Sequence, residues 1–391
     1  MKDRRQIGSP VESPPVRARS ARSRTGPPQA STPVGLKPRA HFVDLLRLVM
    51  SVQMIQGHVI DALLEPARRS GWAFDAWTWV RGLTAVGFLV AAGVSFHLSS
   101  LARWDAYRAD RAGRRRRVKR ALMLIAIGYL LHAPAGVLSG DAEVARAAIE
   151  EAQIVDVLQC IGVTILVLEG IVLVAGSARN VVIASAVLAA LAIGLAPLAA
   201  QVDCTEGGVR LLCNYVSRTG GSLFPLLPWS GFVLAGVVVG AIALPDGART
   251  PGTRTAARLA IAAALAIVGS AVIDALVSRP GEPLAYSASP AFSLSRLGWV
   301  IALAALLALA SHRIVALPRT LRMIAGETLV LYVSHLLMLY VAGIGLARVI
   351  GPTLPLGAAI AMAIAVIAAS VAIAIAWGRW DDRRTTRRVS G

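Results

Sequence analysis

The chain has 391 residues, of which 56% are hydrophobic, and its mean hydropathy is +0.64. Soluble globular chains contain about 45–50% apolar residues, and their helices need a polar face, so an ordinary soluble domain is excluded. The net charge of +18 does not indicate nucleic-acid binding. The basic residues lie between apolar segments, where the positive-inside rule places them in membrane proteins.

The first 40 residues are rich in Pro, Ser and Arg, a composition that favours disorder. We expect residues 1–40 to form a disordered basic cytoplasmic tail. The segment is too long and too polar for a signal-peptide n-region, and no small-residue cleavage site follows the first apolar segment. The first apolar segment is therefore expected to stay in the mature protein.

Ten apolar segments follow, each near the roughly 20 residues that cross a bilayer core about 30 Å thick. They predict an all-α integral membrane protein, a polytopic bundle of about ten transmembrane helices within a membrane domain at 41–378. The expected helices are 42–64, 76–101, 119–139, 153–175, 180–201, 223–244, 256–277, 291–311, 323–348 and 355–377.

The basic connections predict the topology. The N-terminal tail and the 102–120 connection hold nine Lys or Arg residues each, and the tail at 379–391 holds five. With ten helices these segments, and the basic connections at 245–258 and 312–322, share one side of the membrane. We therefore expect both termini to be cytoplasmic, in a multi-pass protein of the bacterial inner membrane.

The cysteines fit this topology. Cys204 and Cys213 fall in one predicted outer loop, where a disulfide suits the periplasm, although two free thiols remain the alternative. Cys160 lies in an apolar helix and is expected to be packing. The sequence holds no HExxH or CxxC motif, so no metal site is predicted.

The first helix carries a polar stripe that includes Asp44, Arg47, His58 and Asp61. Ionisable residues inside a membrane span are costly and suggest function. At about 100° per residue Arg47 and His58 share one face, about 16 Å apart along the helix axis. The plainer alternatives are a local Asp44–Arg47 ion pair and a hydrogen-bonded core histidine at His58.

The spacing of Asp44, Arg47 and His58 resembles the first-helix signature of membrane-bound acyltransferases, which include the acyltransferase 3 and heparan-alpha-glucosaminide N-acetyltransferase families. Further segments are similar to the second family, and the resemblance covers most of residues 40–345. These segments are GFLVAAGVSF (87–96), RALMLIAIGYLL (120–131), VDVLQCIGV (155–163), FPLLPWSGFVLAGVVVG (224–240) and GETLVLYVSHLLMLY (326–340).

The resemblance implies transfer of an acyl group, usually acetyl, from cytoplasmic acetyl-CoA to a sugar or similar envelope acceptor on the periplasmic side. It implies acyl-CoA as a donor substrate and no permanently bound cofactor. The family's essential histidine lies on the non-cytoplasmic side, and His58 is its nearest match, as general base or transient acyl carrier. Asp44 and Arg47 follow from the acyltransferase 3 pattern. Membrane lipids and a periplasmic glycan are the other expected partners, nucleic acid is not, and a homo-oligomer remains open.

Other polar residues are candidates for the substrate channel, and each has a plain structural alternative as a hydrogen-bonded packing residue or an interface anchor. His41, His97, His132 and His312 lie near predicted helix ends and are given no role. The channel candidates are His335, Tyr332, Arg296, Arg81, Asp156, Gln159 and Arg218.

Two other functions remain open at this level. The stripe on the first helix would equally line the pathway of a transporter or flippase for a polar or lipid-linked substrate. A non-catalytic partner in envelope assembly would leave Asp44, Arg47 and His58 free to vary. Binding of CoA and consumption of its thioester distinguish the acyltransferase from a transporter.

Overall fold

The computed structural model describes residues 40–133, 137, 140–205, 210–245, 252–277, 288–314, 316–340 and 345–390. The tail expected at 1–40 therefore lies outside the described residues, except for Ala40. The helical part of the chain forms one compact unit. Apart from one isolated bridge between Leu64 and Leu354, the regular structure of the described residues is helical.

Each of the ten expected segments coincides with helix. The longer helices are α1 (His41–Leu63), α3 (Thr84–Ser99), α5 (Arg111–Leu131), α7 (Val157–Val174), α8 (Ala178–Gly194), α11 (Leu226–Ala243), α12 (Thr253–Val277), α13 (Pro290–Ser311), α15 (Thr328–Tyr340) and α17 (Leu356–Ser390). The shorter ones are η1 (Pro66–Arg68), α2 (Trp72–Arg81), η2 (Leu101–Arg103), α4 (Trp104–Ala109), α6 (Ala142–Glu151), α9 (Ala196–Ala199), α10 (Arg210–Cys213), α14 (Arg319–Gly326) and α16 (Leu346–Val349).

Among the described residues, seven helical segments are long and apolar enough to cross a membrane. The pair α14 and α15 makes an eighth if it is one broken span, since the two helices meet at a bend of 68°. The helix α8 is apolar but has only 17 residues, and α5 begins with the arginine run 114–117. The fold is thus a polytopic α-helical membrane bundle.

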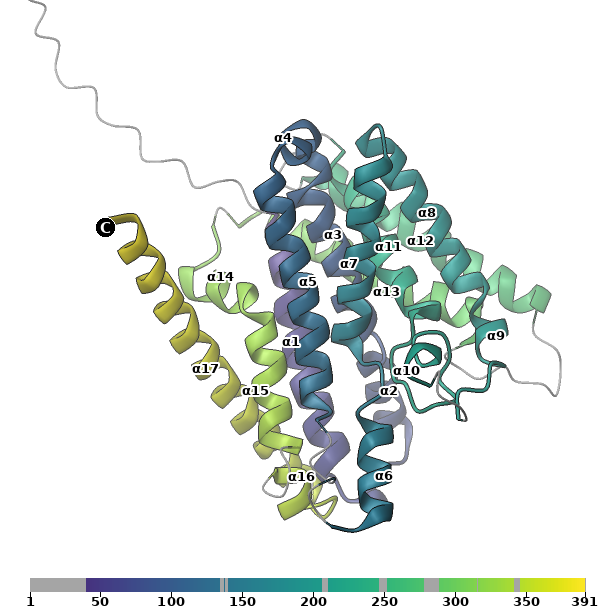
Figure 1. Ribbon diagram of the computed structural model, residues 1–391, viewed down its shortest axis with the longest axis vertical. Coiled ribbons are helices and arrows are strands. Elements are labelled where there is room, and N and C mark those ends of the chain that lie inside the picture. The colour runs from purple at the N-terminus through teal and green to yellow at the C-terminus, as the bar shows by residue number, and fades with distance from the viewer. Residues whose placement is uncertain are drawn as a thin grey trace, which may run out of the picture. The chain divides into compact units, whose positions relative to one another are not determined.

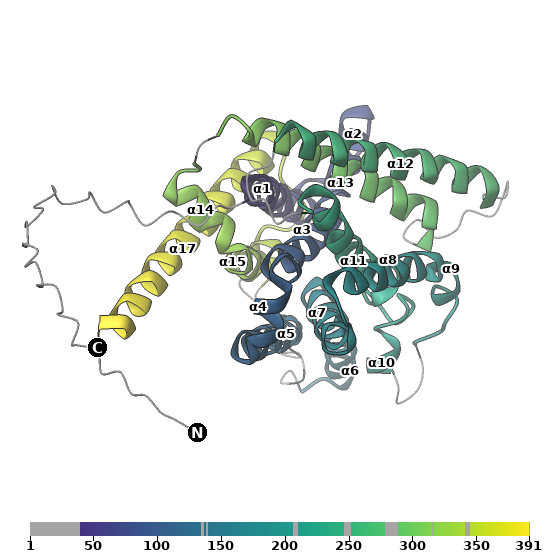
Figure 2. The same cartoon turned by 90° about the horizontal axis from the view of Figure 1, so that it is seen from above.

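Close helix contacts depend on small residues. At the crossing of α3 and α11, a Cβ atom on Gly93 would overlap the carbonyl oxygen of Val233, and one on Gly236 would overlap that of Val90. Small residues let helix backbones approach closely in membranes, where packing rather than water exclusion drives association. Seen from above (Figure 2), α12 and α13 lie along one edge of the bundle, and α5 and α7 lie on the other side of α3.

The helix α1 runs through the interior and contacts α3, α13, α15 and α17. Its polar stripe faces these neighbours: Asp44 and Ser51 are buried, whereas Val49 and Val52 are exposed. The stripe therefore faces protein rather than lipid, as the sequence predicts.

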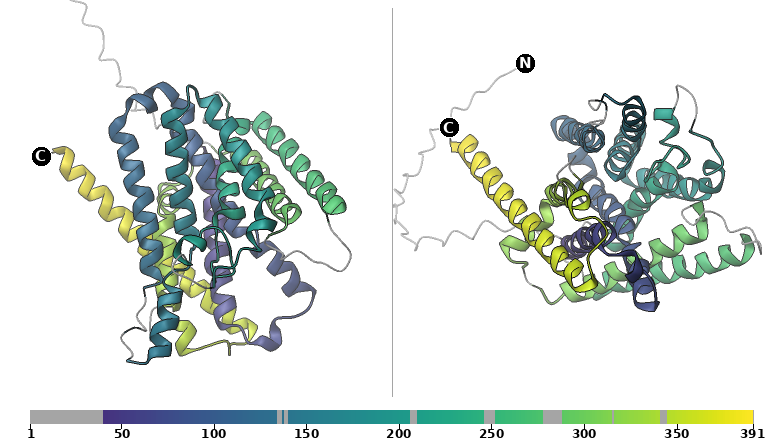
Figure 3. Two further views of the ribbon diagram at one scale, coloured as in Figure 1. Left: turned by 45° about the vertical axis from the view of Figure 1, so that its right-hand side comes forward. Right: turned by 90° about the horizontal axis from the view of Figure 1, so that it is seen from below.

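The bundle has two distinct ends (Figures 1 and 3). At one end α4 joins α3 to the arginine-rich start of α5, and we call it the basic end. At the opposite end lie α2, α6 and α16, and we call it the far end. Because α1 runs from one to the other, it carries Asp44 and Arg47 near the basic end and His58 near the far end.

Candidate active site

A single cavity of about 1650 Å³ is lined by residues from both ends of the bundle. It exceeds the roughly 300–1,000 Å³ of ordinary small-molecule pockets. The charged and hydroxyl-bearing residues that line it include Arg47, Ser95, Ser99, Arg116, Arg117 and Arg120 at the basic end, and His58, Arg81, His132, Glu151, Asp156, Tyr332 and Tyr340 at the far end. Gln53 also lines it, midway between Arg47 and His58 on α1. Between them the wall is mostly apolar, so the cavity connects two polar regions through an apolar passage.

Arg47 marks the basic end of the cavity on α1. Its Nη1 lies 3.9 Å from Asp44 Oδ1, which is the local ion pair that the i,i+3 spacing allows. Its Nη2 also donates to Ser95 Oγ on α3 at 2.5 Å. The guanidinium is thus held between two helices at the cavity wall rather than at a helix end facing lipid.

Arg117 is fixed more firmly than its neighbours. It donates to Ser100 Oγ at 2.6 Å and to Ser99 Oγ at 2.9 Å, and its Nε lies 3.5 Å from Glu169 Oε1. Glu169 is a buried carboxylate on α7, and it also accepts a hydrogen bond from the Tyr107 hydroxyl. This cluster joins α4, α5 and α7, and no local sequence pattern predicts it because its members are far apart in the chain.

The far end brings His58 and His335 together. Their ring centroids are 5.2 Å apart, and Tyr340 packs edge-on to His58 at 6.3 Å. His335 is fully buried, and its Nδ1 lies 2.8 Å from the carbonyl oxygen of Leu331. A carbonyl only accepts, so Nδ1 carries the proton and, in the neutral ring, Nε2 carries the lone pair.

Asp156 links three helices at the far end. Its Oδ2 accepts a hydrogen bond from the Tyr332 hydroxyl at 2.8 Å and lies 3.4 Å from His132 Nε2. Its Oδ1 accepts from the Val157 amide at 2.6 Å, and its own amide donates to Gln159 Oε1 at 3.2 Å. Gln159 therefore completes a capping box at the start of α7 and does not line the cavity.

The contacts of Asp156 shift two pKa values. Burial acts to raise the pKa of the Asp156 carboxyl, but hydrogen bonds from His132, Val157 and Tyr332 outweigh it and the pKa is lowered. The hydrogen bond to Asp156 raises the pKa of His132 in turn, against the effect of its own burial. His132 was given no role from sequence, because nothing in the chain pairs it with a residue 24 positions away.

The three candidate arginines have different surroundings. Arg81 lines the cavity and forms an ion pair with Asp61, one turn beyond His58 on α1. Arg296 is buried, donates to the backbone carbonyl of Trp79 and does not line the cavity. Arg218 donates to the Ser222 carbonyl oxygen at 3.4 Å and also lies outside the cavity wall. Arg81 is thus the arginine of these three that faces the candidate site.

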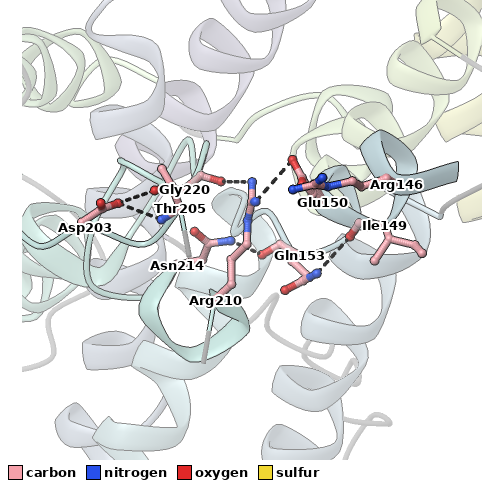
Figure 4. Close-up of polar contacts among 9 residues, drawn as sticks. All are labelled: Arg146, Ile149, Glu150, Gln153, Asp203, Thr205, Arg210, Asn214 and Gly220. Carbon is pink, nitrogen blue, oxygen red and sulfur yellow. Dashed lines mark hydrogen bonds and ion pairs between the residues drawn. The ribbon is translucent and has the colours of Figure 1, made fainter. Parts of the chain in front are cut away.

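The helix α6 closes part of the far end, since Val144, Ala147, Ala148 and Glu151 line the cavity. A loop after α9 holds this helix in place (Figure 4). Arg210 Nη1 lies 3.3 Å from Glu150 Oε2, and Asn214 Nδ2 donates to the Gln153 carbonyl oxygen at 2.8 Å.

A disulfide closes the loop that holds α6. Cys204 and Cys213 are bonded, with Cα atoms 5.5 Å apart, and Cys213 directly precedes Asn214. Gly220 packs against Asn214, and a Cβ atom at Gly220 would overlap Asn214 Oδ1. The described residues of this segment therefore support α6 at the far end through Arg210 and Asn214.

The fold and the cavity define an integral-membrane protein whose ionisable groups line an internal chamber. Residues 39–274 match the family model described as heparan-alpha-glucosaminide N-acetyltransferase, catalytic. The match covers more than half of the chain, and the chain belongs to this family of membrane acetyltransferases, which confirms the resemblance found in its motifs. No curated protein matches the chain at a significant level.

Proposed function

We propose that this protein transfers an acyl group, most simply acetyl, from acyl-CoA at the basic end of the cavity to an acceptor at the far end. The observation that carries the proposal is the single cavity whose lining joins the arginines of one end to His58 at the other. Family membership supplies the reaction class, acetyl transfer. The positive-inside rule makes the basic end cytoplasmic, in the inner membrane of a bacterium.

The basic end suits a donor that carries phosphate groups. Arginine presents a planar fork of donors that matches phosphate oxygens. Arg116 and Arg120 line the cavity beside the fixed Arg117, and the side chain of Arg116 is 74% exposed, so it can turn toward a ligand. Arg47 lies deeper along α1, where it would meet the part of the donor that enters the cavity.

The distance between the ends supports a donor that enters as an extended arm. Arg47 and His58 are eleven residues apart on one helix, which is about 16 Å at 1.5 Å per residue. The phosphates and the thioester therefore occupy different ends, with the pantetheine arm in the apolar passage between Met54, Phe88 and Leu124.

His58 is the group proposed for the chemistry. It lines the cavity and makes no hydrogen bond to the described residues, so its ring nitrogens are available to substrate. As general base it takes the proton of an acceptor O–H or N–H while that oxygen or nitrogen attacks the thioester carbonyl. The C–S bond breaks, and the CoA thiolate then takes up a proton. In the covalent variant a ring nitrogen of His58 attacks the thioester carbonyl, the C–S bond breaks and the CoA thiolate takes up a proton. The acceptor oxygen or nitrogen then attacks the acyl-His58 carbonyl, the acyl C–N bond breaks, and the acceptor proton passes to the freed imidazole.

The acceptor proposed is a periplasmic sugar or a similar envelope molecule. The far end offers it carboxylates, a tyrosine hydroxyl and an arginine that can bind hydroxyl or amino groups, among them Glu151, Tyr332 and Arg81. A transporter or flippase remains the second candidate function, because a cavity that reaches both ends would also serve transport. A transporter would leave acetyl-CoA intact.

The test is acetyl-CoA binding and thioester consumption by purified protein, for wild type, His58→Ala and a control, Val52→Ala, whose side chain is half exposed on the same helix. We expect equal binding by all three and turnover at least about 10²-fold lower in His58→Ala alone, the usual contribution of a general base. Absence of CoA binding by wild type would overturn the proposal in favour of transport. Full turnover by His58→Ala would remove His58 from the chemistry.

A further inference from the structure

Asp156 carries more charge than its helix needs. As the N-cap of α7 it uses one oxygen, Oδ1, to accept from the Val157 amide, and a neutral Ser, Thr or Asn caps a helix about as well. The carboxylate is buried, and burying a charge is costly unless it is paired. The second oxygen, Oδ2, is bound instead to Tyr332 and His132, which points to a role beyond capping.

The Oδ2 atom of Asp156 is connected to His58 through a series of side-chain contacts. Tyr332 stands one turn before His335 on α15, and the two rings meet edge to face at 5.8 Å. The His335 ring in turn packs against His58. His335 Nε2 is buried and has no hydrogen-bond partner among the described residues. Its lone pair is available to accept an N–H of the neighbouring His58 ring, which would leave the other nitrogen of His58 as the base.

The charged groups around His58 come from several elements. Asp61, one turn beyond His58 on the same helix, forms an ion pair with Arg81 of α2, which lines the cavity. His335 and Tyr340 of α15 are neutral neighbours. Asp156, at the start of α7, lines the same cavity as His58, and His132, at the end of α5, lies beside Asp156.

We propose that Asp156 is a positioning residue for His58. Through Tyr332 it holds His335 against the His58 ring, and its negative charge stabilises the imidazolium that His58 becomes when it takes the acceptor proton. The role rests on the proposed function, in which the acceptor proton moves to His58 as the new acyl bond forms and the C–S bond breaks. His132 has the opposite effect, because its positive charge offsets that of Asp156.

The test is a titration of His58 that needs no substrate. The chain has six histidines, so ¹⁵N-histidine NMR of the full chain in detergent can follow each ring, with His58→Gln assigning the signal. In Asp156→Asn, which keeps the cap and an acceptor for Tyr332, we expect the midpoint of His58 to move to lower pH by about half a unit or more. In His132→Gln we expect a shift to higher pH.

A merely structural role cannot move the midpoint in opposite directions in the two variants. An unchanged midpoint in both, or a shift of the same sign, would overturn the inference. Should Asp156→Asn fail to fold, His132→Gln and Tyr332→Phe decide the matter: the first must raise the midpoint, and the second must alter the chemical shifts of the His335 ring. Acyl-CoA turnover by wild type is measured separately, so failure of the proposed function would leave the titration interpretable.

Discussion

The two ends of the cavity are built in different ways. At the basic end, Arg116, Arg117 and Arg120 come from two successive turns of α5. At the far end, His58, His132, Asp156 and Tyr332 come from four different helices or their ends, and a loop closed by a disulfide supports the wall. The basic end thus depends mainly on local sequence, whereas the far end depends on how distant segments pack.

This difference predicts which substitutions should reduce stability or binding at each end of the cavity. Neighbouring arginines on one helix can each contact the same phosphate groups, so substitution of one exposed arginine should change CoA binding little. A site assembled from several helices should respond to changes in the contacts that place those helices. The following predictions test this contrast, starting with the exception at the basic end.

Arg117→Gln should lower the free energy of unfolding more than any other single substitution considered, although Arg117 lies in the arginine cluster. It leaves the buried Glu169 without its cation, and breaking a buried pair by removing one partner costs about 3–5 kcal/mol. Arg116→Gln is the matched control, because that side chain is mostly exposed and an exposed ion pair contributes about 0–1 kcal/mol. Thermal unfolding in detergent and calorimetric CoA binding measure both variants. Equal stability of the two would show that the Glu169 cluster does not hold the basic end together.

Loss of the disulfide should cause the next largest decrease in stability. Cys204 and Cys213 are nine positions apart, and closure of so short a loop contributes about 2–3 kcal/mol in chain-entropy terms. In the double variant Cys204→Ser/Cys213→Ser we expect a lower unfolding temperature and a higher acceptor KM, with acetyl-CoA affinity unchanged. A reducing agent should reproduce this in wild type and do nothing more to the variant. A loss of CoA affinity would contradict the separation of the two ends.

The ion pair between Arg210 and Glu150 should contribute less to stability than the disulfide does. Both side chains are partly exposed, so we expect about 1 kcal/mol or less from the pair and an acceptor KM that rises by no more than about fivefold in Arg210→Ala. A double-mutant cycle with Glu150→Gln isolates the coupling between them. The control is Arg146→Ala, which pairs with the same carboxylate from a side chain that is 83% exposed. Coupling as weak for Arg210 as for Arg146 would mean that the loop does not hold α6.

The smallest effect expected is the pH dependence of the contact between His132 and Asp156. The pKa of His132 is raised in the folded protein, so its stabilising contribution is complete below its unfolded value of about 6.5 and is lost as pH rises through the folded value. The difference in unfolding temperature between wild type and His132→Gln should therefore be greatest at acid pH and vanish at alkaline pH. A difference in unfolding temperature that increases with pH would contradict a stabilising contact between protonated His132 and Asp156.

The sequence predicted the helical class and the location of the helical segments, because apolar length and basic connections are local signals. It also placed the stripe of α1 toward the protein interior, since helical periodicity fixes which residues share a face. The break between α14 and α15 was not predicted. Gly326 and Glu327 stand at the break, between α14 and α15, but one continuous helix was expected over 323–348, and the bend is 68°.

The candidate site was predictable in its parts but not in its connections. His58, Asp156, Tyr332 and His335 were candidates because each is a polar residue within or beside an apolar helix. Their assembly into one chain of contacts depends on which helices are neighbours. Neither apolar length nor charge encodes this neighbour relation, and for the same reason His132 was overlooked.

Donor and acceptor are proposed to occupy opposite ends of one cavity, and sealed vesicles allow each end to be supplied separately. The protein is reconstituted with a bacterial envelope extract sealed inside as acceptor and radiolabelled acetyl-CoA outside. The orientation of each preparation is read from labelling of Arg116→Cys by an impermeant maleimide. The account predicts that acetyl reaches the enclosed material only through molecules whose basic end faces outward, and that His58→Ala abolishes it. Transfer through molecules of the opposite orientation would contradict the account.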